Sequence, residues 1–265
     1  MTCFRTLASG SSGNAALLSA GSTHLLIDMG ISCRRICQTL SSLGLRPEDL
    51  SAVLITHEHS DHISGLATYI KKYHTPIFCT PGTAWQLRYR LAGVEPLLRP
   101  MPYGETFPLG DVEITLLPTS HDCSESSAFR IETASGGLGY LTDTGYILEE
   151  TAQRLLGVEL LVLESNHDVD MLRAGPYPFP LKQRVLGPQG HLSNDDAARY
   201  ASASAQAGTR SIILAHLSKE NNTPQAALAA VGQALEAVGY SGELTVAPRD
   251  TPGELHILER LQCSV

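Results

Sequence analysis

Short runs of apolar residues, many of them β-branched, alternate along the chain with longer segments in which apolar positions recur every three or four residues. The short runs are typical of β-strands and the longer segments of helices. Strands are expected at 4–8, 15–21, 23–28, 52–56, 76–80, 112–118, 127–133, 137–143, 160–165, 211–217, 243–248 and 254–259. Helices are expected at 32–43, 63–73, 82–91, 147–156, 193–207 and 223–238, the last starting at the pair Thr223 and Pro224.

The order of these elements suits two β-sheets packed face to face with helices outside. Short strands dominate the opening third of the chain, and the remainder mixes strands and helices. No proline- or serine-rich linker, charge block or low-complexity stretch divides the 265 residues. We therefore expect a single domain over residues 1–265.

The composition is that of an ordinary globular protein, with 43% hydrophobic and 17% charged residues. The first residues, MTCFRTLASGSSGN, contain no basic region followed by an apolar core, and no apolar run is long enough to span a membrane. The six cysteines form no CxxC pair, which favours reduced thiols. We therefore expect a cytoplasmic protein without a membrane partner.

The net charge of -8 argues against a surface coated with phosphate-binding lysines. It does not exclude nucleic acid, because bound divalent cations reverse the local field where a phosphate would lie. Arg88, Arg90 and Arg99 are expected to form a solvated face of the protein. The single tryptophan, Trp85, is expected to pack in the core.

Residues 54–62 read LITHEHSDH and gather imidazoles and carboxylates on one loop. Side chains so crowded would desolvate one another, and the imidazoles would repel when protonated. A cation removes this conflict, because neutral imidazole and carboxylate are ligands of zinc and its first-row neighbours. The loop also follows an expected strand, and the carboxyl ends of strands are where α/β sheets place their sites. The candidate ligands here are His57, His59, Asp61 and His62.

Three further residues stand directly behind apolar strand patterns later in the chain. His121 ends LLPTSH, Asp143 ends GYLTD and His216 ends IILAH. A site for two metals needs ligands from more than one loop, so we expect these three side chains to join those of the 54–62 loop.

These residues together resemble the metallo-β-lactamase superfamily, whose HxHxDH signature reads HEHSDH here. The resemblance covers nearly the whole chain and implies an α/β fold, a four-layer αβ/βα sandwich of two mixed β-sheets with helices on the outer faces. It implies one metal on His57, His59 and His121, a second on Asp61, His62 and His216, and Asp143 as the bridge. It also makes Asp28, in LLIDMG, a residue that orients a ligand imidazole from behind.

Members of this superfamily catalyse several reactions, and the candidate ligands of this chain favour some of these reactions over others. Lactamases of the dizinc type resemble this order but carry cysteine where Asp143 stands, which disfavours antibiotic hydrolysis. Two closely spaced cations suit a phosphoryl transfer, and thioester hydrolysis could use the same centre. Manganese and zinc both suit the ligand set. A small-molecule hydrolase of the glyoxalase II or cyclic-phosphodiester kind, and a non-enzymatic cofactor-delivery protein, are the alternatives.

Five further motifs resemble the YycJ/WalJ group of bacterial hydrolases: LASGSSGN at 7–14, ESNHD at 164–168, LKQRV at 181–185, GHLSN at 190–194 and AHLSKENNTP at 215–224. This resemblance implies a cytoplasmic, metal-dependent DNA exonuclease that works from 5′ ends by attack of a metal-bound hydroxide on phosphorus. The stretch between Asp143 and His216 is too short for the inserted cap domain of β-CASP nucleases. The site is therefore expected to be open to a nucleic-acid end.

Substrate contacts are expected from two segments of the chain. In SGSSGN, the side chains of Ser12 and Asn14 could form an anion-accepting rim. Lys182 and Arg184 could reach phosphate from the LKQRV segment.

Two histidines lie outside the seven-ligand set. His167 and His191 are expected to line the cleft and to donate hydrogen bonds to phosphate oxygens, and one of them could be the general acid. Together with Asp61, they are the residues expected to act in catalysis.

Overall fold

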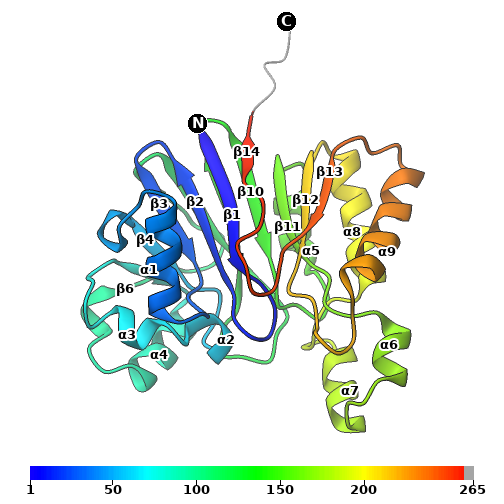
Figure 1. Cartoon of the computed structure of the whole chain (residues 1–265), viewed down its shortest axis with the longest axis horizontal. Helices are drawn as coiled ribbons and strands as arrows, with labels where there is room; N and C mark the ends of the chain where they lie inside the picture. The colour runs from blue at the N-terminus through cyan, green and yellow to red at the C-terminus, as the bar shows by residue number, and fades with distance from the viewer. Residues whose placement is uncertain (260–265) are drawn as a thin grey trace, which may run out of the picture.

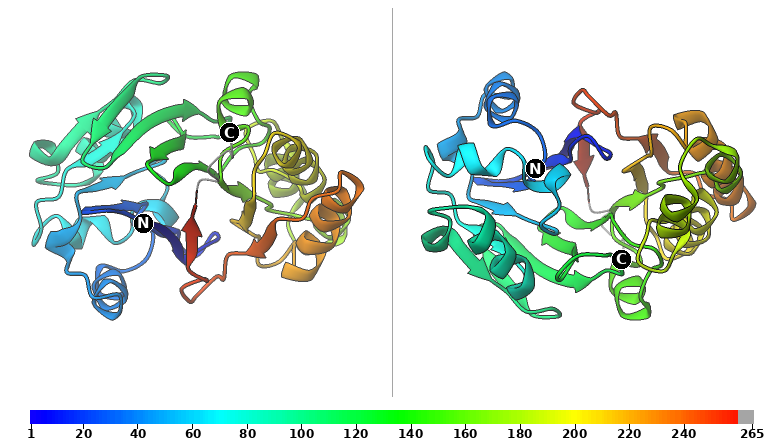
Figure 2. Two further views of the ribbon diagram at one scale, coloured as in Figure 1. Left: turned by 90° about the horizontal axis from the view of Figure 1, so that it is seen from above. Right: turned by 90° about the horizontal axis from the view of Figure 1, so that it is seen from below.

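The computed structural model describes residues 1–259 and shows two β-sheets facing each other, with helices on the outer face of each (Figure 1 and Figure 2). In order across the first sheet lie β14 (His256–Leu258), β1 (Thr2–Ala8), β2 (Ala15–Ala20), β3 (Thr23–Ile27), β4 (Ala52–Leu54), β5 (Ile77–Cys79) and β6 (Leu98–Pro100). The second sheet has β13 (Glu243–Val246), β12 (Ser211–Ala215), β11 (Leu160–Glu164), β10 (Gly136–Leu141), β9 (Ser127–Thr133), β8 (Val112–Pro118) and β7 (Thr106–Leu109).

Both sheets are mixed, as the resemblance implies. Strands from β3 to β6 run parallel in the first sheet, and strands from β10 to β13 run parallel in the second. Against the first sheet lie α1 (Cys33–Ser42), α2 (Ser60–Ile63), α3 (Leu66–Tyr69) and α4 (Pro81–Arg90). Against the second lie α5 (Glu149–Leu155), α8 (Asn194–Gln206) and α9 (Pro224–Ala237). The short helices α6 (Val169–Ala174) and α7 (Phe179–Leu186) project at the lower right of Figure 1.

Three separate hydrophobic cores account for the four layers. Successive side chains of a strand point to opposite faces of a sheet. Leu17 and Leu26 accordingly pack toward the outer helices, whereas Leu18 and Leu25, one residue away, pack between the two sheets. The third core joins the second sheet to α8 and α9. Strands buried on both faces read as continuous apolar runs, which is the pattern that the sequence presents.

Each expected strand is present, and the helical predictions are correct except at 63–73. There α2 ends at Ile63, Ser64 and Gly65 interrupt the helix, and α3 covers only Leu66–Tyr69. A Cβ on Gly65 would lie 2.2 Å from the carbonyl oxygen of Ile31, so only glycine allows this close approach. The strands β6 and β7 and the helices α6 and α7 were not expected. All four are short, and prolines lie inside or beside β6, β7 and α7.

Two expectations about individual residues are also decided. Trp85 does not pack in the core, since 61% of its surface is exposed on α4. The described cysteines are free thiols, as predicted, whereas Cys263 lies outside the described residues. Over residues 1–259, none of the helices has both the length and the apolar character that crossing a membrane would require.

Candidate metal centre

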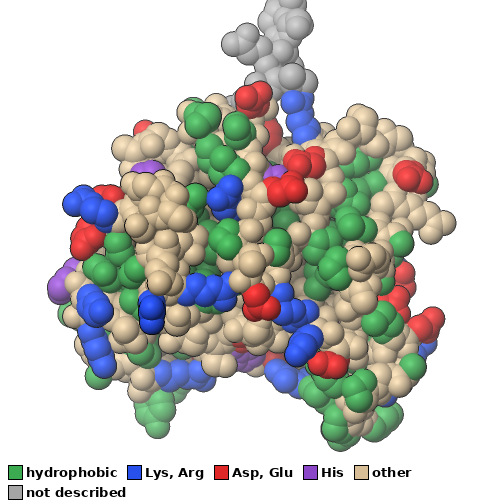
Figure 3. Space-filling model, viewed as in Figure 1, with side chains coloured by type: hydrophobic (Ala, Val, Ile, Leu, Met, Phe, Trp, Pro, Cys, Tyr) green, Lys and Arg blue, Asp and Glu red, His purple; other side chains and the backbone are tan. Residues whose placement is uncertain are grey.

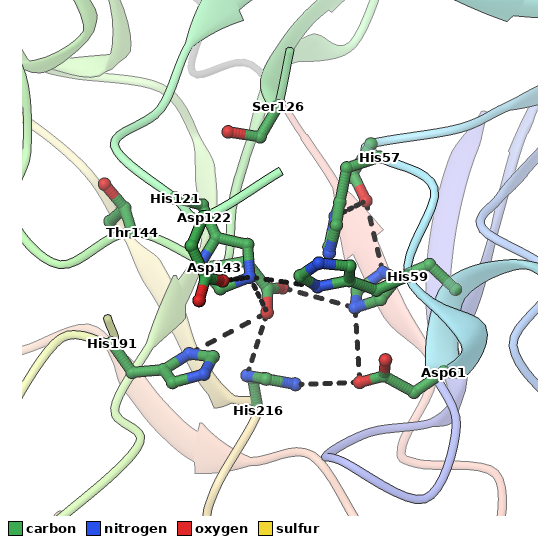
Figure 4. A network of polar contacts seen from close by, with 12 residues as sticks. His57, His59, Asp61, His121, Asp122, Ser126, Asp143, Thr144, His191 and His216 are labelled. Atoms are coloured by element: carbon green, nitrogen blue, oxygen red, sulfur yellow. Dashed lines mark hydrogen bonds and ion pairs between the residues drawn. The ribbon is translucent and has the colours of Figure 1, made fainter. Parts of the chain in front are cut away.

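The loops that follow four strands bring the seven expected ligands to one edge of the sandwich. Two sets of side chains each have their ligand atoms within 4.8 Å of one another. The first set is His57, His59 and His121, and the second is Asp61, His62 and His216. Figure 4 shows that the labelled members of both sets point toward a common centre from separate loops: His57, His59, Asp61, His121 and His216.

Asp143 lies between the two sets. Its carboxylate oxygens are 3.4 Å from His62 Nε2 and 3.9 Å from His121 Nε2. The ligand atoms of Asp143, His57 and His62 also lie within 4.8 Å of one another. One carboxylate therefore reaches ligands from both sets, which is the position that a bridge between two cations needs.

The backbone is bent sharply at three positions around this centre. Asp28, Asp143 and His216 have φ of 58°, 57° and 56°, and they are the non-glycine residues with positive φ in the described chain. The left-handed conformation costs an L-residue about 1 to 2 kcal/mol. Each of the three follows closely on a strand, so the bend turns its side chain out of the sheet and into the site.

Asp28 supports His62 from behind. Its Oδ2 lies 2.7 Å from His62 Nδ1, and its Oδ1 accepts a hydrogen bond of 2.8 Å from the backbone N–H of Thr56. Burial raises the pKa of Asp28, and the proximity of His62 opposes that shift. Because Nδ1 donates to Asp28, His62 presents Nε2 to the cluster. This is the orienting role that the resemblance implies for Asp28.

Glu164 plays a matching part in the second sheet, and the sequence analysis missed it. It is the last residue of β11 and fully buried, and its Oε1 lies 2.7 Å from His191 Nδ1 and 3.0 Å from His216 Nδ1. Burial raises the pKa of this carboxyl, but the two imidazoles hold it well below its usual range. An acid directly behind an apolar strand was the signal used for Asp143, and it could have found Glu164.

The cluster requires positive charge. Burial lowers the pKa of His216, but the surrounding carboxylates, Asp143 above all, outweigh it and raise the value to about 10. Burial instead keeps the pKa of His57 well below its usual value, which leaves the neutral imidazole that metals bind. Three buried atoms of the cluster, His57 Nε2, His216 Nε2 and Asp143 Oδ2, have no hydrogen-bond partner within residues 1–259. A divalent cation would satisfy them and balance the carboxylates, so the residues present fit a metal centre.

The centre opens into a pocket of about 230 Å³ whose lining includes Ser11, Arg184 and His191. His191 is held by Glu164 with 19% of its side chain exposed, as a cleft residue should be. Arg184 Nη2 donates to Asp122 Oδ1 at 3.0 Å. The structure thus brings these two expected substrate contacts to the pocket.

Four other expected contacts lie elsewhere. Ser12 does not line the pocket, whereas its neighbour Ser11 does. Asn14 is buried behind the ligands: its Oδ1 accepts a bond of 2.8 Å from Gly10 N, and its Nδ2 lies 3.1 Å from His62 Nε2. It therefore supports the 54–62 loop rather than forming an anion rim.

The expectation that His167 lines the cleft is wrong. It is 1% exposed, lies outside the pocket lining, and its backbone forms a bridge with Ser193. Burial lowers its pKa to about 4. Lys182 also faces away from the pocket and donates from Nζ to the carbonyl oxygen of Arg173 at 2.6 Å. Neither side chain is part of the pocket lining.

Comparisons with known proteins agree with this geometry. A family model described as a beta-lactamase superfamily domain matches residues 23–217. Exodeoxyribonuclease YycJ of Bacillus anthracis is 36% identical over 239 residues, which are 89% of this chain and 90% of that protein. Exodeoxyribonuclease WalJ of Streptococcus pneumoniae is 38% identical over 228 residues, 84% of each chain.

A solved structure shares the fold at low sequence identity. The metallo-beta-lactamase fold protein YhfI from Bacillus subtilis has a TM-score of 0.71 and 20% identity, and the match covers 96% of this chain and 100% of that one. The fold and the sequence relatives therefore agree on one superfamily.

Replacing Asp28 with asparagine should weaken metal binding by about 10- to 100-fold, because the amide keeps the bond from Thr56 but loses the charge that orients His62. Isothermal titration of metal-free protein with zinc measures the change. Asp49→Asn, which alters an exposed ion pair with Arg46, is the matched control. Unchanged affinity in Asp28→Asn would show that His62 does not depend on Asp28.

Proposed function

Since the chain belongs to the metallo-β-lactamase superfamily and, within it, to the YycJ/WalJ group, we propose that it is a metal-dependent exodeoxyribonuclease acting from 5′ ends in the cytoplasm. Both curated relatives are exodeoxyribonucleases, and each match spans most of both chains. The observation that carries the proposal is the position of Asp143, within reach of two separate ligand sets.

Two divalent cations would be held at this centre. His57, His59 and His121 would hold one, Asp61, His62 and His216 would hold the other, and Asp143 would bridge them. In support of this, the ligand atoms of each set of three lie within 4.8 Å of one another. Manganese and zinc suit these nitrogen and oxygen ligands. Bound cations of this kind activate water and neutralise charge on a phosphoryl group.

The protein's own side chains position the substrate and move the proton. His191 gives its Nδ1 proton to the bond with Glu164 at 2.7 Å, so Nε2 is the nitrogen available to the pocket. From Nε2, His191 donates a hydrogen bond to a phosphate oxygen or gives a proton to the leaving oxygen. A charge-assisted donor aimed at phosphate stabilises the transition state more than the ground state, because charge develops on those oxygens.

Arg184 supplies the second contact. Its guanidinium is exposed at the pocket, and its bond to Asp122 fixes the plane of the fork. A strand whose terminal phosphodiester lies beside Asp143 would bring a neighbouring phosphate toward this group. The polar lining of the pocket, with Asn166 and Ser218 beside the metal ligands, suits such a substrate.

The proposal is tested with metal-reconstituted protein and single- and double-stranded DNA labelled at one end. We expect mononucleotides to appear from the 5′ end, only with manganese or zinc present. RNA of the same sequence and a thioester are the comparison substrates. Asp143→Ala, purified in the same way, controls for contaminating nuclease and should be inactive. Thioester hydrolysis without DNA cleavage would contradict the proposal.

His191→Ala should lower DNA turnover by about 10²- to 10⁴-fold while metal content stays at the wild-type level. The reason is that His191 faces the pocket, and its Nδ1 lies closer to Glu164 Oε1, at 2.7 Å, than to Asp143 Oδ1, at 3.8 Å. Turnover and metal content are measured on the same sample. His74→Ala, at an exposed position, should match the wild type in both. Loss of metal from His191→Ala would make it a ligand instead.

A further inference from the structure

Two exposed aromatic side chains stand on α4, at one side of the metal centre. Trp85 is 61% exposed and Tyr89 is 85% exposed. Residues four apart lie on the same face of a helix, so the two rings form one continuous aromatic face. Nothing in the catalytic arrangement described above uses it.

The helix α4 is fastened to the metal-binding loops. Arg90 donates from Nη1 to the carbonyl oxygen of Glu58, between His57 and His59, at 2.7 Å. At its other end, Thr80 and Thr83 donate from their hydroxyls to the carbonyl oxygen of Glu125 at 2.7 and 3.0 Å. The aromatic face is therefore held in a fixed position relative to the ligands.

On the other side of the centre, α7 forms a wall of the pocket through Leu181, Arg184 and Val185. Its first residue, Phe179, is 72% exposed. Figure 1 shows α4 and α7 at opposite lower corners of the molecule, with α2 of the metal loop between them. In Figure 3, hydrophobic side chains gather at both of these corners, and Lys and Arg side chains lie along the edge between.

Both helices are basic although the chain as a whole carries a net charge of -8. Their charged residues are Arg88 and Arg90 on α4 and Lys182 and Arg184 on α7, and neither helix contains an acid. Arg88 and Arg184 pair with carboxylates of neighbouring segments. Arg90 and Lys182 instead donate to backbone carbonyl oxygens and so keep their full charge.

We propose that the exposed faces of α4 and α7 form a docking surface for single-stranded nucleic acid that leads to the metal centre. Trp85, Tyr89 and Phe179 stack on bases, and the basic residues of the two helices face the phosphates. Aromatic rings interleaved with cations are the means by which proteins hold single strands without sequence preference. The inference rests on the proposed nuclease function. The positive charge of the two helices favours a phosphate-bearing strand as the occupant, because a purely apolar partner would make no contact that uses these cations.

The test measures binding of a fluorescent single strand of about ten nucleotides, within the usual range of single-strand site sizes, by anisotropy in EDTA to prevent cleavage. We expect the double variant Trp85→Ala, Tyr89→Ala to weaken binding by about 10-fold or more, and Phe179→Ala to weaken it by a similar factor. Trp85→Phe with Tyr89→Phe should restore it. Leu255→Ala, which removes an exposed apolar side chain far from α4 and α7 in sequence, should bind as the wild type does.

A second measurement separates docking from chemistry. Cleavage of a small aryl phosphodiester, which reaches only the metal centre, should proceed at the wild-type rate in all these variants. If the wild type binds and cleaves DNA but the alanine variants bind it equally well, the docking surface is wrong and the nuclease function stands. If the wild type neither binds nor cleaves nucleic acid, the proposed function fails and the docking surface fails with it. Loss of small-substrate cleavage in the variants would also overturn the docking role.

Discussion

Buried carboxylates packed against imidazoles at one edge of the sandwich are the constraint on which the rest of this structure depends. Asp143 and Glu164 have almost no contact with water, and like charges so close are stable only when positive charge lies between them. Protons on the histidines or bound cations can supply that charge. The left-handed backbones of Asp28, Asp143 and His216 are the strain that the fold accepts to aim these groups inward.

The two sheets divide the work of supporting this centre. In the first sheet, Asp28 at the end of β3 fixes the ring of His62. In the second, Glu164 at the end of β11 fixes the rings of both His191 and His216. The three apolar cores hold in place the strands from whose ends these residues project. The α6–α7 segment departs from this plan, because it projects from the sandwich and α7 lines one side of the pocket.

Much of this could be predicted from the sequence, because periodicity and strand-end residues act locally. Every strand that was expected is present, although β6 and β7 were not expected. The candidate ligands of the 54–62 loop were singled out because imidazoles and carboxylates crowd together there. The failures occur where the direction of a side chain depends on tertiary contacts. His167 and His191 look alike in sequence, yet one is buried behind Ser193 and the other reaches the pocket. The helices α6 and α7 have too few turns for a helical period of apolar residues to be visible in the sequence. Trp85 is hydrophobic, and the sequence does not show that α4 exposes it to solvent.

The central claim is that this edge of the fold is a centre for two cations, and metal-dependent stability tests it most directly. Metal-free protein is titrated with manganese or zinc while bound metal and the unfolding temperature are followed together. A ligand that binds only the folded state stabilises it by about 2.7 kcal/mol at a hundred times its dissociation constant. The account predicts that the unfolding temperature rises with bound metal and that binding saturates at two ions per chain. Saturation at one ion, or an unfolding temperature that does not respond to metal, would contradict it.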